Sequence, residues 1–142
     1  MKASFEEKSV WVQLVTMLLV MGAYFVVAGG MMAEGVMKMA AYAGLFIVTV
    51  IAHVVLLVVG YIVAVVSGLP REPEDADERD RLIDWRSESR SAWIVGVGSL
   101  TAVTAMVFEV QNVWIAHILL LSMFLAELVK NSLQLLAYRR GF

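Results

Sequence analysis

A few polar side chains inside long apolar stretches are the residues of this chain that could do chemistry. Glu127 is the first candidate, because an ionisable carboxylate that lies deep in a membrane-spanning helix is a functional-site hypothesis by default, here for a proton or a cation. Counting back from Arg139 at about 1.5 Å per residue places Glu127 roughly 18 Å from that end of its stretch. An ion pair with Lys130, Arg86 or Arg90 is the structural alternative, and we expect it first.

The two histidines, His53 and His117, stand in two different apolar stretches. Facing histidines in a membrane bundle can serve as axial ligands of a b-type haem. His53 lies about 13 residues into its stretch and His117 about 4, so two parallel helices that start level would separate them by roughly 13 Å. Polar packing is therefore the preferred interpretation, and haem-based electron transfer is a minor alternative.

Polar residues within the apolar stretches are expected to face the interior of a bundle, where they find hydrogen-bond partners. One helical face of the second stretch carries small or polar residues along its whole length: Tyr42, Thr49, His53, Gly60 and Ser67. This pattern favours close packing against a neighbouring helix. The intramembrane polar residues that we single out are Gln13, His53, His117, Glu127 and Asn131.

A densely charged segment, residues 71–90, separates the second and third apolar stretches. Asp75 and Glu78 have the spacing of a capping box, so a helix is predicted from about residue 76. Its continuation into the third stretch is one alternative, and a break at the run Ser87, Ser89 and Ser91 is the other.

The charged segment is also the largest surface that a partner could reach from water. Its acids have neither the glycine nor the spacing of an EF-hand, so no metal site is predicted. A solvated face of salt bridges is the plain interpretation, and charge-specific recognition is the functional one. The candidate partner-binding residues are Asp77, Glu78, Arg79, Asp80, Arg81, Asp84 and Trp85.

The composition and the lengths of the apolar stretches predict the helices that position these residues. The chain of 142 residues is 61% hydrophobic, whereas a soluble domain is usually about half apolar. Four stretches are long enough to cross a bilayer: residues 10–32, 40–68, 92–110 and 113–138. We therefore predict one all-α domain over residues 1–142, a polytopic bundle of four transmembrane helices. A helical loop, residues 69–91, connects the second and third helices.

Orientation is predicted from lysine and arginine. Ten of the 11 lie in the N-terminal tail, the charged segment and the C-terminal end, and only Lys38 lies in the other two connections. Basic residues favour the cytoplasmic side. We therefore expect a multi-pass protein of the inner, cytoplasmic membrane, with the loop and both termini in the cytoplasm.

Several function classes have no support in the residues. The chain has no cysteine, which excludes disulfides and thiolate chemistry. Catalytic triads, glycine-rich phosphate loops and basic nucleic-acid patches are absent from the sequence, so an enzyme, a bound cofactor and a nucleic-acid partner are not predicted. The small-residue pairs Ala92/Gly96 and Gly98/Ala102 favour close helix packing, within one chain or in a homo-oligomer.

The segment Asp77-Glu78-Arg79-Asp80-Arg81-Leu82-Ile83, with Arg90-Ser91-Ala92 and the ending Tyr138-Arg139-Arg140-Gly141, resembles a family of small prokaryotic membrane proteins of unknown function. That family has four spans and a D-E-R-x-x-x-I motif in its central cytoplasmic loop. The resemblance implies this topology and, since family members often neighbour small helix-turn-helix regulators, regulation through protein contact.

The leading hypothesis is a non-enzymatic interaction or regulatory protein whose charged loop helix binds a cytoplasmic or membrane protein, or a second copy of the chain. The alternative is a small oligomeric transporter or ion-conducting protein that uses Glu127. In this alternative the carboxylate lies in the fourth apolar stretch, whereas four-span drug exporters of similar size carry one in the first.

Overall fold

The chain folds into four long α-helices and contains no strand within residues 5–66 and 78–140, which the computed structural model describes. The elements are α1 (Phe5–Ala33), a short 3₁₀ helix η1 (Met39–Tyr42), α2 (Ala43–Val66), α3 (Glu78–Val107) and α4 (Asn112–Arg140). The predicted all-α, four-helix class is thereby confirmed.

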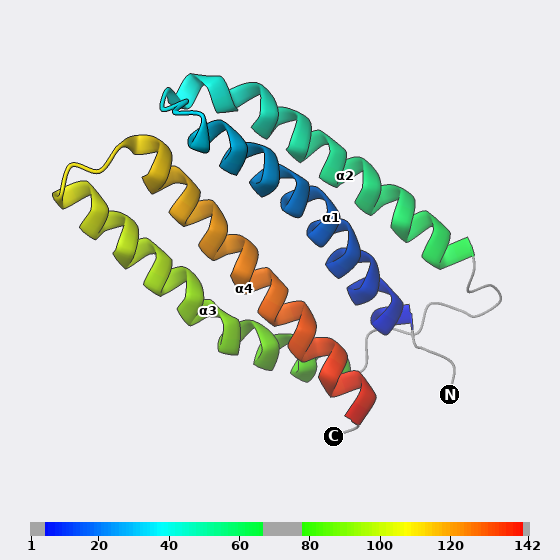
Figure 1. Cartoon of the computed structure of the whole chain (residues 1–142). Helices are drawn as coiled ribbons and strands as arrows, with labels where there is room; N and C mark the ends of the chain where they lie inside the picture. The colour runs from blue at the N-terminus through cyan, green and yellow to red at the C-terminus, as the bar shows by residue number, and fades with distance from the viewer. Residues whose placement is uncertain (1–4, 67–77, 141–142) are drawn as a thin grey trace.

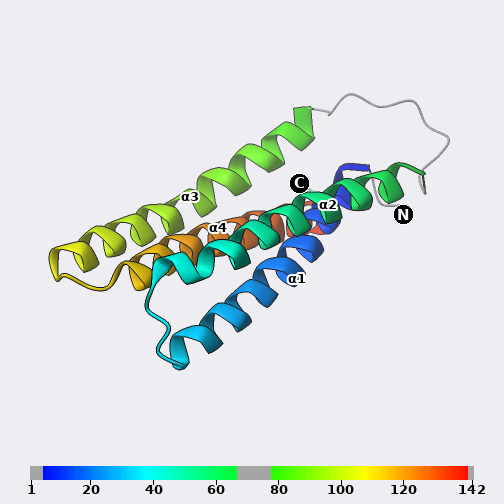
Figure 2. The same cartoon turned by 90° about the horizontal axis from the view of Figure 1, so that it is seen from above.

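The helices form two antiparallel hairpins that lie side by side (Figure 1). The order across the molecule is α2, α1, α4, α3, and the main packing pairs are α1 with α2, α1 with α4, and α3 with α4. Seen from above, α3 is displaced to one side and α1 to the other, so the four helices do not share one plane (Figure 2). Helices α2 and α3 are therefore the outer members of the bundle.

All four α-helices are long and apolar enough to cross a membrane, as in a multi-pass membrane protein. Helix α2 shows this most clearly, because almost none of its most apolar window is buried against the rest of the chain. Its exposed side chains include Ile47, Val48, Ile51, Val54, Val58, Ile62 and Val63. A continuous apolar surface of this extent is unusual on a soluble monomer and is expected against hydrocarbon.

The described part of the predicted loop, residues 78–91, and the predicted third span form one helix. Helix α3 begins at Glu78 and runs unbroken past Ser87, Ser89 and Ser91 to Val107, so of the two alternatives the structure has the continuous helix. Its 30 residues correspond to about 45 Å, more than the roughly 30 Å of a hydrocarbon core. The predicted capping residue Asp75 lies outside the described residues.

Small residues set the closest approaches between helices. A side chain at Gly60 of α2 would collide with Val12 of α1, and a side chain at Gly98 of α3 would collide with Ser122 of α4. Gly96, by contrast, has no atom near enough to meet an added Cβ. Of the two predicted small pairs, Gly98/Ala102 is thus buried in the hairpin, while Ala92/Gly96 lies on the exposed side of α3.

Helices α1 and α3 end with the same hydrogen-bond pattern. After α1, Val36 N–H donates to the Met31 carbonyl and Gly35 N–H to that of Met32, with Gly35 in the left-handed region at φ 81°. After α3, Val110 and Glu109 repeat these bonds, and Glu109 itself has a φ of 54°. Both are Schellman caps, which satisfy the last carbonyls of a helix and favour glycine at the position that Glu109 occupies.

Candidate functional site

Two polar clusters lie toward opposite ends of α4. The first surrounds His117 near the beginning of the helix, where Tyr24 of α1 and Tyr42 of η1 pack against it. The second surrounds Lys130 and Gln134 near the end of the helix, where acids of α3 face them. Each cluster joins elements that are far apart in the sequence.

The His117 ring is fully engaged by its neighbours. Its Nδ1 lies 2.7 Å from the Val113 carbonyl oxygen, which can only accept, so Nδ1 carries the proton. The other nitrogen, Nε2, therefore accepts a hydrogen bond from the Tyr24 hydroxyl at 3.0 Å. The Tyr24 ring stacks on the imidazole at 5.7 Å between centroids, and the Tyr42 ring meets it edge-on at 5.0 Å. This is a satisfied, buried histidine that ties α1 and η1 to α4.

The two histidines are not brought together. Phe46 of α2 lies at the level of Tyr24, with ring centroids 6.4 Å apart, and His53 follows seven residues later, about 10 Å further along the helix. His53 Nδ1 is buried without a hydrogen-bond partner in the described part of the chain. Since both nitrogens of His117 have partners, a haem between the two residues would require a different packing.

The second cluster is a series of ion pairs and hydrogen bonds between α3 and α4, which we call the ladder. Lys130 Nζ lies 3.3 Å from Asp84 Oδ1 and 3.5 Å from Glu88 Oε2. Gln134 donates from Nε2 to the same Asp84 oxygen at 2.7 Å. One turn further out, Tyr138 of α4 interacts electrostatically with Asp80 of α3. Because residues four apart share one helical face, the acids of α3 meet the donors of α4 along about two turns.

Two buried amide oxygens lie within this cluster without a donor. Asn131 is 2% exposed, and neither its Oδ1 nor Gln134 Oε1 has a hydrogen-bond partner within the described residues. An unpaired buried acceptor costs about 1–3 kcal/mol. This end of α4 therefore combines charge, buried amides and incomplete hydrogen bonding. The arrangement can hold a proton or a polar group but forms no group of three metal-ligating side chains within the described ranges.

Glu127 and Gln13 are placed differently from each other. Glu127 lies on the exposed surface of α4, on the side of Lys130, with which it interacts electrostatically. Gln13 is half-buried between α1 and α2, where its Nε2 donates to the Tyr61 hydroxyl at 2.6 Å. The bundle interior thus holds Gln13, while the Glu127 carboxylate faces away from it.

The candidate partner-binding residues divide between two sides of α3. Asp80 and Asp84 face α4 through the ladder, whereas Arg79, Arg81 and Trp85 are exposed. Glu78 begins the helix and is also exposed, and it has interactions of its own. Asp77 lies outside the described residues. Asp80 and Asp84 thus contact α4, although the Asp84 side chain stays 55% exposed, while Arg79, Arg81 and Trp85 present exposed side chains to a partner.

The contacts of Lys130 and Gln134 with the acids of α3 were not predicted from the sequence, and neither was the hydrogen bond between Tyr24 and His117. The spacing of Asp84 and Glu88 matches that of Lys130 and Gln134, a signal that could have suggested an antiparallel ladder. Tyr24 is not among the residues singled out from the sequence, and nothing in its local spacing indicates His117, which lies 93 residues away.

Comparison of the chain with protein-family models, with curated proteins and with solved structures gives no match. The resemblance carried by Asp77–Ile83 therefore stays a prediction.

Proposed function

We propose that this protein is a non-enzymatic interaction or regulatory protein of the inner membrane, and that the exposed face at the beginning of α3 binds a protein partner. The observation that carries the proposal is Trp85, which is 67% exposed and lies one turn from Leu82, itself 46% exposed. Arg81 is exposed beside them. An aromatic anchor flanked by charges is the composition of an interface hot spot.

The proposed orientation places this face in the cytoplasm. The first turns of α3 share their end of the bundle with the N-terminal end of α1 and the C-terminal end of α4 (Figure 1). The excess of lysine and arginine in the N-terminal tail, the charged segment and the C-terminal end supports a cytoplasmic location for this end.

The ladder supports the proposal by fixing α3 in place. Asp84 and Glu88 bind Lys130 on the side toward α4, so the opposite side of α3 is presented on a helix that is held along two turns. A surface that is already ordered loses less entropy on binding than a disordered segment does. In this view Asp80 and Asp84 position the helix, while Glu78, Arg81 and Trp85 touch the partner.

The test is affinity capture of the tagged protein from native membranes, followed by mass spectrometry. We expect a stoichiometric partner that is lost with Trp85→Ala and with Arg81→Glu. Trp93→Ala is the matched control, because Trp93 is equally exposed at 65% but lies in the apolar part of α3. Capture that survives both α3 substitutions would contradict the proposal. A differently tagged second copy in the same experiment identifies a homo-oligomer.

A second candidate function is transport by an oligomer through Glu127. The observation that favours it is the exposed position of this carboxylate in the apolar part of α4, beside a lysine that already binds two other acids. An exposed carboxylate is costly in hydrocarbon and would be relieved by water or by a second copy. Proton-coupled flux in liposomes that disappears with Glu127→Gln and survives Glu109→Gln would establish it. Absent or unchanged flux would remove it.

A further inference from the structure

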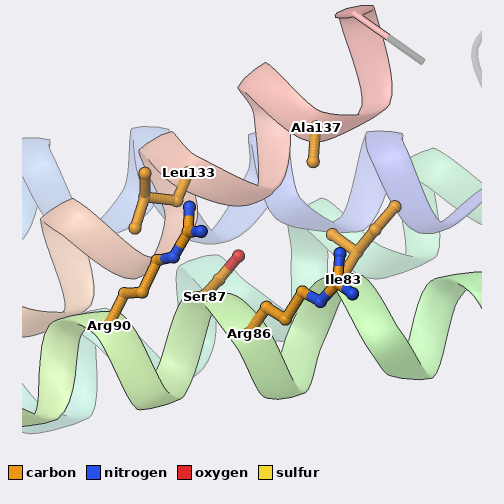
Figure 3. Close-up of a pocket in the computed structure, with 6 residues that line it drawn as sticks. All are labelled: Ile83, Arg86, Ser87, Arg90, Leu133 and Ala137. Atoms are coloured by element: carbon orange, nitrogen blue, oxygen red, sulfur yellow. The ribbon is translucent and has the colours of Figure 1, made fainter. Parts of the chain in front are cut away.

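A groove opens between α3 and α4 on the side away from the ladder (Figure 3). It has a volume of about 110 Å³ and is lined by Ile83, Arg86, Ser87 and Arg90 of α3 and by Leu133 and Ala137 of α4. Each arginine follows a ladder acid, Asp84 or Glu88, by two residues, which turns it about 160° away around the helix. The acids and the arginines of α3 thus occupy opposite sides of its contact with α4.

The groove combines cationic donors with a buried floor. Ile83, 1% exposed, and buried Ser87 line it from α3, while Arg90 extends toward Leu133 of α4 and Arg86 extends along α3 toward Ile83 (Figure 3). Arg86 and Arg90 are one helical turn apart, so both guanidinium groups can reach one oxyanion. Within the described residues no carboxylate lies at ion-pair distance from Arg90. The Arg90 guanidinium and the Ser87 hydroxyl are donors of the kind that recognise a phosphate group, and Arg86, which has interactions of its own, lies one turn away.

The position of the groove indicates the source of that phosphate. Directly after Arg90 the sequence of α3 turns apolar, and Trp93 is exposed one turn deeper. Tryptophan and arginine at the end of a span mark the level of the lipid headgroups. The α4 side of the groove is apolar, through Leu133 and Ala137, and exposed Leu136 continues it. A ligand with a phosphate and an acyl chain fits this combination better than a free anion does.

We propose that the groove between α3 and α4 binds the headgroup of a net-anionic phospholipid, with Arg86 and Arg90 on its phosphate and the acyl chain along the apolar wall of α4. Two arginines favour a headgroup without a compensating amine, because a zwitterionic lipid would bring a second cation toward them. Basic pockets between spans on the cytoplasmic side are a recurrent way of holding such lipids. This inference is independent of the partner-binding face, which lies on the neighbouring side of α3.

The test is native mass spectrometry of the purified full chain in detergent, titrated with phosphatidylglycerol, phosphatidylcholine or inorganic phosphate. We expect phosphatidylglycerol to bind in preference to the other two. Arg86→Gln and Arg90→Gln should each weaken it about fivefold, the effect of one basic residue near a membrane surface. Arg81→Gln is the matched control, since it removes the same charge from the exposed face and should leave lipid binding within about twofold.

Each other outcome would overturn the proposal. Equal retention of phosphatidylcholine would show a general annular lipid, and equal binding of inorganic phosphate would show a site for free anions. An equal loss with Arg81→Gln would show attraction by net charge alone. The two groove arginines are exposed, so their variants should fold, and unchanged tryptophan fluorescence and elution volume verify this. Arg90→Lys, which keeps the charge but not the planar fork, should bind with intermediate strength.

Discussion

The Tyr24 hydroxyl donates a hydrogen bond to His117 Nε2 across 3.0 Å, and this bond joins the second half of α1 to the beginning of α4. The two residues also stack, with ring planes 14° apart. The pair connects the two hairpins at a buried point, where no water replaces a lost bond. Removing this bond should therefore lower the free energy of unfolding of the whole bundle.

Tyr24→Phe keeps the ring and removes this bond. We expect a loss of about 0.5–2 kcal/mol in the free energy of unfolding, the range for hydrogen bonds between membrane helices and for an acceptor left unpaired. Reversible unfolding in mixed micelles, followed by tryptophan fluorescence, measures it. Val26→Ala, at a position that is exposed on α1, is the control and should change little. Equal effects of the two substitutions would contradict a structural role for the pair.

The contact of Gly98 with Ser122 is the basis of a second prediction. Gly98→Leu should separate α3 from α4 and cost about 1–3 kcal/mol or more, because the added side chain has no space against Ser122. Gly96→Leu adds the same side chain two residues earlier, where nothing lies close, and should be tolerated. The same unfolding measurement compares the two variants. A larger loss at Gly96 would mean that the exposed side of α3 is the packed one.

Much of this architecture could be predicted because membrane helices leave a strong signal in the sequence. An apolar run such as the one over α2 determines both a helix and its surroundings, and small residues such as Gly60 and Gly98 indicate where backbones approach. The charged start of α3 was also predicted to be helical, since Asp75 and Glu78 have the spacing of a capping box.

The order of the helices and the side that each polar residue faces could not be predicted in the same way. Glu127 and Asn131 are one turn apart, yet Asn131 is buried and Glu127 is exposed. A small rotation of α4 decides between these outcomes, and it is determined by packing against α1 and α3 together. The division of the α3 acids and arginines between two sides likewise depends on where α4 lies.

The ladder leads to a third prediction. A double-mutant cycle with Lys130→Met and Asp84→Asn should give a coupling energy of about 0.5–1 kcal/mol, as for partly exposed ion pairs. The Asp84 side chain is 55% exposed, so the coupling should weaken as salt is added. A cycle of Lys130→Met with Glu34→Gln, at the other end of the bundle, is the control and should give none. Equal coupling in both cycles would contradict a direct pair.

Glu109 leads to a fourth prediction, because it occupies the left-handed position of the α3 cap. Glu109→Gly should raise the free energy of unfolding by about 1 kcal/mol, since glycine adopts this conformation without a steric penalty. Gly35→Ala, at the same position of the α1 cap, should lower it by a similar amount. Thermal unfolding of the two variants beside the parent chain checks both signs. A loss of stability with Glu109→Gly would show that its side chain contributes more than its backbone costs.

The absence of cysteine makes the proposed orientation directly measurable, because a single introduced thiol is the only one that reacts. Arg81→Cys, at an exposed position near the beginning of α3, should react with a membrane-impermeant maleimide only after the cells are opened. Lys38→Cys, in the exposed connection between α1 and η1, should react in intact cells. The reverse pattern would place the partner-binding face outside and contradict the orientation. Reaction of both thiols in intact cells would instead contradict a crossing between the two positions. Leu100→Cys, exposed in the apolar part of α3, should stay unlabelled in either case, because hydrocarbon excludes the charged reagent and keeps the thiol protonated.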